Sequence, residues 1–338
     1  MNTKRLARFA ASGGIVWVVV VVIALYAFIA SDTFRTTSNM TNLSRQMVVL
    51  ALASFAQFVV VLTGGVDLSI GANVRVSAIV AAIVMDGSDG RFVIGVLAAL
   101  AVSLLIGFVN GIVTVTLRVE PFIATLGTGA IVSGLALYLA STPTGRASPM
   151  WIDLYGSSIG PVPILVVLAA IALSIVWTLL YRMRWGRHLY AVGGDAEVAR
   201  LSGVRSIRVA ISAYVLAGAL AGLAGLVVIG RTGVGDASSA SALEFETLAV
   251  VVIGGASLAG GRGRFIGVLG GVVLFGMLNN VFNLLKLEVW YQELVRGAVI
   301  LVAAALYLQR RRDEHAVRPT TDTGRPSPAT TNASGGAP

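Results

Sequence analysis

Long runs of apolar residues with few charged side chains dominate this sequence. The first run covers residues 13–30, and further runs lie at about 47–63, 69–85, 92–117, 121–140, 161–181, 209–230, 245–259, 265–285 and 291–308. About 20 consecutive apolar residues in a helix cross the hydrocarbon core of a bilayer. Only 12 % of the residues are charged, which is about half the share in a soluble globular protein. The sequence therefore predicts an all-α, polytopic membrane protein with about ten transmembrane helices.

Two glycine pairs interrupt the apolar runs. Gly64-Gly65 lies inside the stretch 47–85, and Gly254-Gly255 lies inside the stretch 245–285. Because glycine weakens a helix, each stretch folds either as two full spans or as a broken pair. The eight residues from Gly64 match the eight from Gly254 at four positions. This match favours a parallel pseudo-repeat of the spanning unit, although glycine enrichment alone would produce it too.

Basic residues are concentrated at the two ends of the chain and in one internal segment, 182–208. Lys and Arg beside membrane spans mark the cytoplasmic side. We therefore expect both termini and segment 182–208 to be cytoplasmic, and residues 141–160 and 231–246 to be periplasmic. Since the charge sits between membrane spans, topology explains the net charge of +9 better than nucleic-acid binding does.

The two ends of the chain complete this domain organisation. Residues 1–12 are predicted to be a short cytoplasmic segment. The run 13–30 has no convincing A-x-A-like cleavage site, so we expect it to be the retained first helix of a membrane domain covering 13–308. Residues 309–338 are rich in Pro, Gly, Ser and Thr, and they are expected to form a disordered cytoplasmic tail.

Several kinds of chemistry are excluded by residue types. The chain has no cysteine, which excludes disulfides and thiolate metal sites. His188 is the only histidine outside the predicted tail, so a histidine-based metal or catalytic site is not expected. Neither of the two lysines follows a glycine, and no G-x-x-x-x-G-K-[ST] motif is present. The chain therefore does not bind ATP through a P-loop.

Polar residues inside the apolar runs are candidates for a translocation path. Asp67 precedes Ser69 at an expected helix start, so its carboxylate either caps that helix or contacts a solute. Arg75, in the same helix, either reaches the inner headgroups or lines the path. Six uncharged amides suit a hydroxyl-rich solute and suit contacts between helices equally well. They are Gln57, Asn73, Asn110, Asn279, Asn280 and Asn283.

The basic segment 182–208 contains a short predicted helix. Asp195 is placed to cap its start, and Gly203 follows its end. A helix of about two turns is marginal in water and persists only when it docks on something larger. Its apolar residues, Val198 and Leu201, therefore face either a partner protein or, in an interfacial connector, the lipid headgroups.

Motifs along the chain resemble those of ABC permeases of the ribose and simple-sugar importer family. The longest is Gly186-Arg187…Tyr190-Ala191-x-Gly193-Gly194…Ala199-Arg200-Leu201-Ser202-Gly203-Val204. The others are Gly65-Val66-Asp67-Leu68-Ser69-Ile70-Gly71, Asn110-Gly111, Pro121-Phe122-Ile123-Ala124-Thr125-Leu126-Gly127-Thr128, Gly254-Gly255-x-Ser257-Leu258-x-Gly260-Gly261-x-Gly263, and Asn279-Asn280…Asn283-Leu284-Leu285 with Gln292. Together they cover about residues 45–308 in family order.

This resemblance implies a fold of the type II importer kind and a path for a sugar of the ribose, xylose or galactose class across the bacterial inner membrane. It makes 186–204 the element that docks on an ATPase, with Arg187, Arg200 and Arg205 near acidic residues of that partner. The coupling residues so implied are Gly186, Arg187, Gly193, Gly194, Asp195, Val198, Arg200, Leu201 and Gly203. Arg75 departs from the apolar residue usual in the family.

The resemblance also implies the partners of the chain. They are an ABC ATPase subunit that holds ATP and magnesium, a periplasmic or lipid-anchored solute-binding protein, and a second permease copy, identical or related. The remaining surface would face membrane lipid, and no nucleic acid is involved. The chain itself is expected to be a translocation subunit without enzymatic activity, cofactor or metal.

Two other classes of protein are the alternatives. An ion-coupled secondary transporter needs buried carboxylates as relay groups, and only Asp67 and Glu120 qualify. An intramembrane enzyme needs a Ser–His pair, paired aspartates or a metal cluster, and the predicted spans contain none of these. The permease interpretation is therefore favoured.

Overall fold

The computed structural model describes residues 14–288, 290–292, 294–295 and 297–298, most of which are helical. The first elements are α2 (Gly14–Ala30), the 3-10 turn η1 (Asp32–Arg35), α3 (Thr37–Leu62), α4 (Ile70–Met85), the 3-10 turn η2 (Asp89–Arg91), α5 (Phe92–Gly111), the π-helical turn η3 (Ile112–Thr116) and α6 (Pro121–Leu139). They are followed by α7 (Pro149–Gly156), the strands β1 (Ser158–Ile159) and β2 (Val162–Pro163), α8 (Ile164–Tyr181), α9 (Arg184–Gly194), α10 (Ala196–Leu201), α11 (Ser206–Thr232), α12 (Leu243–Ile253) and α13 (Phe265–Leu284).

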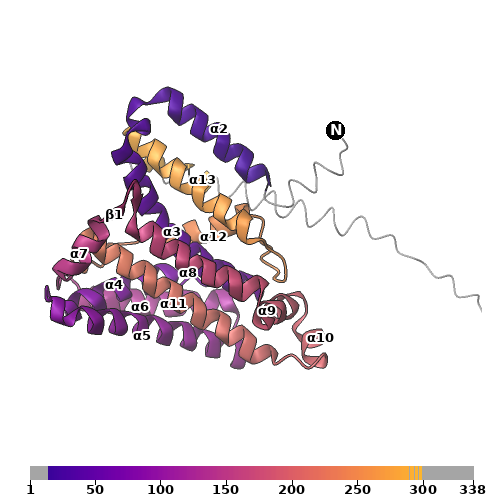
Figure 1. Cartoon of the computed structure of the whole chain (residues 1–338). Helices are drawn as coiled ribbons and strands as arrows, with labels where there is room; N and C mark the ends of the chain where they lie inside the picture. The colour runs from indigo at the N-terminus through magenta and orange to yellow at the C-terminus, as the bar shows by residue number, and fades with distance from the viewer. Residues whose placement is uncertain (1–13, 289, 293, 296, 299–338) are drawn as a thin grey trace, which may run out of the picture.

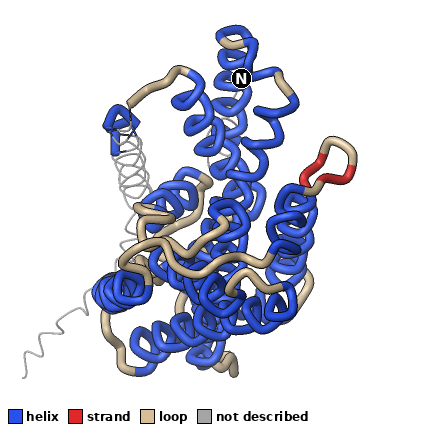
Figure 2. The backbone as a smooth tube through the Cα atoms, turned by 90° about the vertical axis from the view of Figure 1, so that its left-hand side faces the viewer, coloured by secondary structure: helices blue, strands red, loops and turns tan. Residues whose placement is uncertain are grey.

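The long helices form a bundle with two distinct ends (Figure 1). We call the end that carries α9 and α10 the arginine-rich end. The opposite end carries α7 and the antiparallel pair of β1 and β2, and we call it the hairpin end. Figure 2 looks onto the hairpin end, where the two strands project from the bundle. This hairpin, with two residues in each strand, was not predicted from the sequence.

Helix α11 lies at the centre of the bundle, packed on α3, α4 and α5. Its glycines at a spacing of four, Gly218 and Gly222, sit directly on Ser103 of α5. A methyl group at Gly218 would overlap the carbonyl oxygen of Ser103, so these glycines allow the two backbones to approach closely. A second apolar cluster joins α2, η1 and α13 on the other side of α3.

Six helical stretches in the described residues are long and apolar enough to cross a membrane. They are Thr37–Leu62, Asp89–Thr116, Pro121–Leu139, Ile164–Tyr181, Ser206–Thr232 and Phe265–Leu284. Two shorter apolar helices, Val16–Ile29 and Ile70–Met85, accompany them. The expected number of about ten spans is not confirmed, and the predicted segments 1–12 and 309–338, with most of the span 291–308, lie outside the described residues.

Of the two alternatives for the stretch 245–285, the broken pair fits the structure and two full spans do not. Helix α12 ends at Ile253, so its 11 residues extend about 16 Å at 1.5 Å per residue, about half of a hydrocarbon core. The predicted start of the second span is wrong, because α3 begins ten residues earlier, at Thr37. The Thr36 hydroxyl caps this helix by accepting the N–H of Asn39 at 3.3 Å.

Both predicted glycine breaks end a helix in the same conformation. Gly64 follows α3 and Gly255 follows α12, each with a φ of 86°. By this left-handed geometry Gly64 corresponds to Gly255, whereas the sequence comparison aligned Gly64 with Gly254. Since many helices end on such a glycine, the parallel pseudo-repeat remains a prediction.

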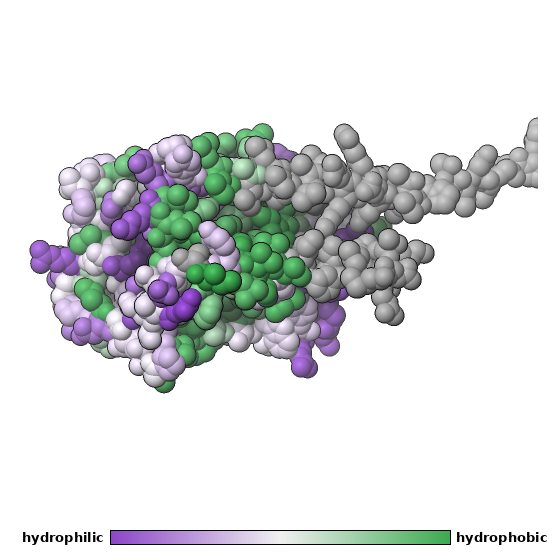
Figure 3. All heavy atoms as spheres, turned by 90° about the horizontal axis from the view of Figure 1, so that it is seen from above, coloured by the Kyte–Doolittle hydropathy of each residue, from purple (hydrophilic) through white to green (hydrophobic). Residues whose placement is uncertain are grey.

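The hydropathy of the surface differs between the middle of the bundle and its two ends. Figure 3 shows hydrophobic side chains gathered in the middle of one face, with hydrophilic side chains toward the hairpin end and toward the opposite end. Large apolar side chains are exposed along α5, α6 and α8. Such a band is expected of a surface that faces lipid or another membrane subunit.

Candidate functional site

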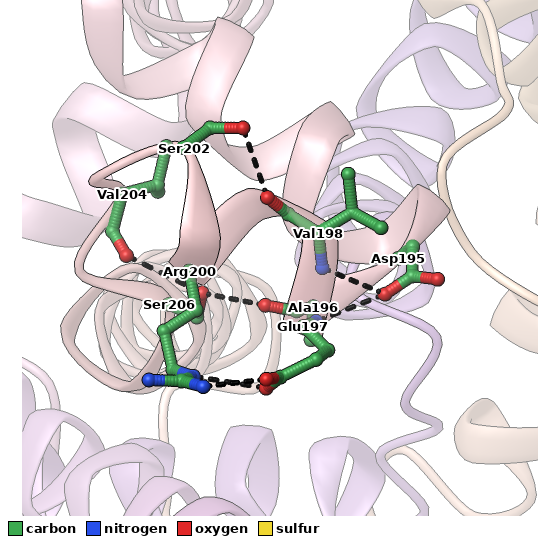
Figure 4. A network of polar contacts seen from close by, with 8 residues as sticks. All are labelled: Asp195, Ala196, Glu197, Val198, Arg200, Ser202, Val204 and Ser206. Atoms are coloured by element: carbon green, nitrogen blue, oxygen red, sulfur yellow. Dashed lines mark hydrogen bonds and ion pairs between the residues drawn. The ribbon is translucent and has the colours of Figure 1, made fainter.

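Helices α9 and α10 form the polar corner at the arginine-rich end. The sequence predicted the second of these helices only. Asp195 caps α10 as predicted, since its Oδ1 accepts the N–H groups of Glu197 at 2.9 Å and Val198 at 3.0 Å (Figure 4). Gly203 follows the helix with a φ of 83°, the left-handed geometry that favours glycine.

Arg200 is already paired within α10. Its guanidinium donates to both carboxylate oxygens of Glu197, with Nε 2.9 Å from Oε2 (Figure 4). The hydrogen bond from Arg200 lowers the pKa of the Glu197 carboxyl. Because both side chains are exposed, such a pair adds little to stability. Arg200 is therefore less free to pair with a partner than the sequence suggested.

The apolar side of α10 points into solvent. Val198 is 58 % exposed and Leu201 is 73 % exposed. The same short helix is held to α11, because the Ser206 hydroxyl donates to the Ala196 carbonyl at 3.0 Å. A fixed helix of six residues that presents two uncovered apolar side chains has the form of a docking element.

Gly193 joins α9 to the glycine-rich turns of the bundle. A methyl group here would overlap the carbonyl oxygen of Leu62, the last residue of α3. The same oxygen accepts the N–H of Gly261 at 3.0 Å. Gly260 in turn lies against Gly64 and the Gly193 carbonyl. The end of α9 therefore touches both the α3–α4 turn and the loop between α12 and α13.

Aromatic side chains fix α9 further. The Tyr190 hydroxyl donates to the carbonyl of Gly263 at 3.0 Å, and the Trp185 indole N–H donates to the Ser212 hydroxyl of α11 at 2.7 Å. At the start of α9, Gly186 leaves no room for a methyl group beside the carbonyl of Leu180. A movement of α9 would therefore be transmitted to α11 and to the start of α13.

Asp67 lies in the α3–α4 turn and is 3 % exposed. Its Oδ1 accepts the N–H of Ser69 at 2.8 Å and the Ser69 hydroxyl at 2.6 Å, and lies 3.5 Å from the Asn110 amide of α5. Asn110 also donates to the Ser69 hydroxyl at 2.7 Å. Asp67 stands three positions before Ile70, the first residue of α4, and accepts the N–H of the N-cap residue Ser69 rather than an N–H of the first helical turn.

The remaining amides form contacts between helices. Asn73 of α4 donates to the Ser103 carbonyl of α5 at 3.3 Å, and Asn280 of α13 exchanges hydrogen bonds with Asn39 of α3 at 2.8 and 3.2 Å. Asn279 donates to Glu246 of α12 at 2.8 Å. Asn283 is exposed. Among the described residues, fully buried Gln57 has no hydrogen-bond partner for either amide atom.

Comparison with known proteins identifies the family. A family described as "Branched-chain amino acid transport system / permease component" matches residues 39–304. The chain belongs to this permease family. It is 36 % identical to the ribose import permease protein RbsC of Bacillus subtilis (strain 168) over 84 % of this chain and 89 % of the relative.

Relatives of this permease carry the names of several sugars. The Escherichia coli (strain K12) ribose import permease protein RbsC is also 36 % identical, over 83 % of this chain and 90 % of the relative. The D-allose transport system permease protein AlsC of the same organism is 31 % identical, over 87 % of this chain and 90 % of the relative. No solved structure matches the permease at a significant level.

The predicted path residues of the permease do not converge on one site. Asp67, Asn73 and Asn110 lie between α4 and α5, whereas Asn279 and Asn280 lie on α13. Arg75 donates from its Nε to the carbonyl of Ser239 at 3.0 Å, a contact that the sequence did not indicate.

Several polar partners in the permease were missed by sequence reasoning. Asn39 lies in a polar stretch that hydropathy assigned to a loop, and Thr125 bonds the N–H of Leu68 from 57 residues away at 3.0 Å. Glu244 and Glu246 were assigned to a periplasmic loop but stand in the first turn of α12. The charge of these two glutamates beside an apolar run was the one available signal.

Proposed function

We propose that this chain is the translocation subunit of an ATP-driven importer that carries a sugar across the bacterial inner membrane. The observation that carries the proposal is the corner at the arginine-rich end. There a capped helix with exposed Val198 and Leu201 is joined, through Gly193, to the turns that open α4 and α13.

In this mechanism a separate ATPase subunit binds ATP and magnesium and receives α10 in an apolar groove. Closure of two such subunits moves α9 and α10. Gly193 of α9 packs so closely on Leu62 that a methyl group would not fit between them. The movement therefore passes to the α3–α4 turn and to the loop before α13. The bundle then alternates between states open to either side.

The topology of the proposal follows the arginines. The arginine-rich end faces the cytoplasm, with both termini on that side. The hairpin end faces the periplasm and meets a periplasmic or lipid-anchored solute-binding protein. A second permease copy, identical or related, and membrane lipid cover the exposed apolar faces of α5, α6 and α8.

The choice of a sugar rests on the relatives. The family description names branched-chain amino acids, whereas the relatives that match most of the chain are named for ribose, D-allose and other sugars, including fructose and galactose. Similarity to such relatives over most of the chain favours a hydroxyl-rich solute for this chain.

The experiment is reconstitution. The chain is purified with its ATPase subunit and inserted in proteoliposomes, and uptake of labelled ribose, galactose and leucine is measured with the binding protein and ATP. We expect ATP-dependent uptake of a sugar and no uptake of leucine. ATP-dependent uptake of leucine without any sugar would overturn the choice of solute. Uptake that an ion gradient drives without an ATPase would establish the secondary transporter.

A further inference from the structure

The segment 233–242 enters the bundle from the hairpin end without forming a helix. It follows α11, and Gly235 pairs with Thr144 through backbone hydrogen bonds of 2.8 and 3.0 Å. Gly235 also lies against Ile79 and Ala82 of α4. Further along, the carbonyl of Ser239 accepts the Arg75 Nε. The segment therefore runs beside α4 toward the arginine-rich end.

The segment reaches membrane depth. Gly235 lies beside Ala82, and Glu244, just after the segment, lies directly on Gly71. Ala82 and Gly71 are 11 positions apart in sequence, which corresponds to about 16 Å along a helix. This is about half of a hydrocarbon core of roughly 30 Å. Irregular backbone at such depth occurs where it is buried in protein or lines a water-filled cavity.

The backbone of the segment favours the water-filled cavity. Residues 237–242 form successive turns and no helix. The φ angles of Ala240 and Ala242 are 55° and 59°, a left-handed conformation that costs an alanine about 1–2 kcal/mol. Strain of this kind gathers at functional sites.

The side chains divide the segment into two faces. Ala237 is buried in a cluster with residues of α4, α5 and α6. Ser238 and Ser241 are exposed, and Asp236 accepts both the N–H and the hydroxyl of Ser238, at 2.8 and 2.7 Å. The uncovered face is polar.

Two charged residues flank this polar face. Arg75 uses its Nε on Ser239, and no ion pair joins it to an acid in the described part of the chain. The Oε2 atom of Glu244 is buried and has no hydrogen-bond donor there. A donor group and an acceptor atom therefore remain available beside the exposed Ser238 and Ser241.

The geometry points to residues 236–242, with Arg75 and Glu244, as the part of the translocation path that binds the solute. The ligand is an uncharged polyol, in line with the sugar of the proposed function on which this inference rests. Its hydroxyls accept from Arg75, and they donate to Glu244 and to the carbonyl groups of the segment.

Cysteine labelling tests the placement. Since the chain has no cysteine, single thiols at Ser238→Cys and Ser241→Cys are unambiguous. The transporter in nanodiscs is treated with a charged, membrane-impermeant thiol reagent. Leu105→Cys, on the exposed apolar face of α5, is the matched control because it faces lipid or a subunit. We expect both serine positions to react at least tenfold faster than position 105.

Protection by the solute tests the binding role. A saturating concentration of the transported sugar should slow labelling at 238 and 241 several-fold, and leucine should not. Ser158→Cys, on the exposed hairpin, should react equally with and without sugar. Labelling of 238 and 241 no faster than 105 would overturn the water-filled path. Labelling without protection, in a protein that takes up the sugar, would overturn the binding role.

A kinetic measurement separates binding from folding. Arg75→Gln removes the charge and should raise the KM of sugar uptake about tenfold, as expected from losing one charge-assisted hydrogen bond. Arg75→Lys keeps the charge and should recover most of the affinity. Equal losses of maximal rate in both variants, with an unchanged KM, would assign Arg75 to structure alone. Failure of all sugar uptake by the unmodified protein would reject the proposed function, while the labelling result still decides whether the segment faces water.

Discussion

The carboxylate of Asp67 is engaged by three donors in a site that is nearly closed to solvent. Asp67→Asn retains an oxygen that accepts the N–H and hydroxyl of Ser69, so uptake should stay within a few-fold at normal abundance. Asp67→Leu leaves Ser69 and Asn110 without this acceptor, at about 1–3 kcal/mol for each buried group. Uptake per unit of membrane protein, with thermal unfolding, measures both variants. Loss of uptake in Asp67→Asn at normal abundance would assign the negative charge a direct function.

Gly193 and Gly194 form a matched pair on α9. A methyl group at Gly193 would overlap the Leu62 carbonyl, whereas nothing lies within 4 Å of one at Gly194. Gly193→Ala should therefore separate α9 from the α3–α4 turn and abolish sugar-stimulated ATP hydrolysis. Gly194→Ala should keep full activity and stabilise the helix by up to about 1 kcal/mol. Equal ATPase stimulation in the two variants would show that the contact with Leu62 does not transmit movement.

Residue-level prediction succeeded where the partners are close in sequence. Asp195 and Gly203 were assigned correctly because a cap depends on residues two or three positions away. The contact of Arg75 with the carbonyl of Ser239 was not predicted, because the two residues are 164 positions apart. Nor does a single sequence indicate that Thr125 bonds to Leu68, since this contact depends on how α6 packs on α4.

Among the elements, α10 makes the clearest experimental prediction. Leu201 is its most exposed apolar side chain. If α10 occupies a groove of the ATPase, Leu201→Asp buries an unpaired charge at a cost of several kcal/mol, and the complex should not form. Leu201→Met keeps an apolar side chain of similar volume and should preserve the complex. Co-purification and stimulated ATP hydrolysis measure the outcome. Intact complexes with Leu201→Asp would leave α10 as an interfacial connector.

The elements were predicted well where hydropathy and length agree. The runs at 121–140 and 265–285 correspond closely to α6 and α13. Prediction failed where a helix continues through polar residues, as in the first turns of α3, and where an apolar run is too short to span, as in α12. Segment 233–242 contains no helix signal, yet its contact with α4 brings it to membrane depth. Such placement follows from tertiary packing and leaves no trace in the hydropathy of a single segment.

At the scale of the whole molecule, the two glycine breaks connect the arginine-rich corner with the polar interior. The α3–α4 turn touches Gly193 and carries Asp67, and α12 leads from Glu244 to the loop that touches Gly193 and Gly194. A shift of α9 would therefore reach the start of α4 and the far end of α12 together. Helices α4 and α12 both border segment 233–242. A movement of α9 and α10 would therefore also reach the polar face of that segment.

The last prediction concerns which end of the bundle faces the cytoplasm. The arginines gathered around α9 and α10 should hold that end in the cytoplasm, because basic residues near spans are retained there. Ala196→Cys marks this end and Ser158→Cys marks the hairpin end, each as the sole thiol of the chain. In cells with a permeabilised outer membrane, an impermeant thiol reagent should label position 158 and not 196. Lysed membranes should label both, which controls for reactivity. Labelling of 196 alone in the unlysed cells would place α10 outside, where no ATPase can receive it.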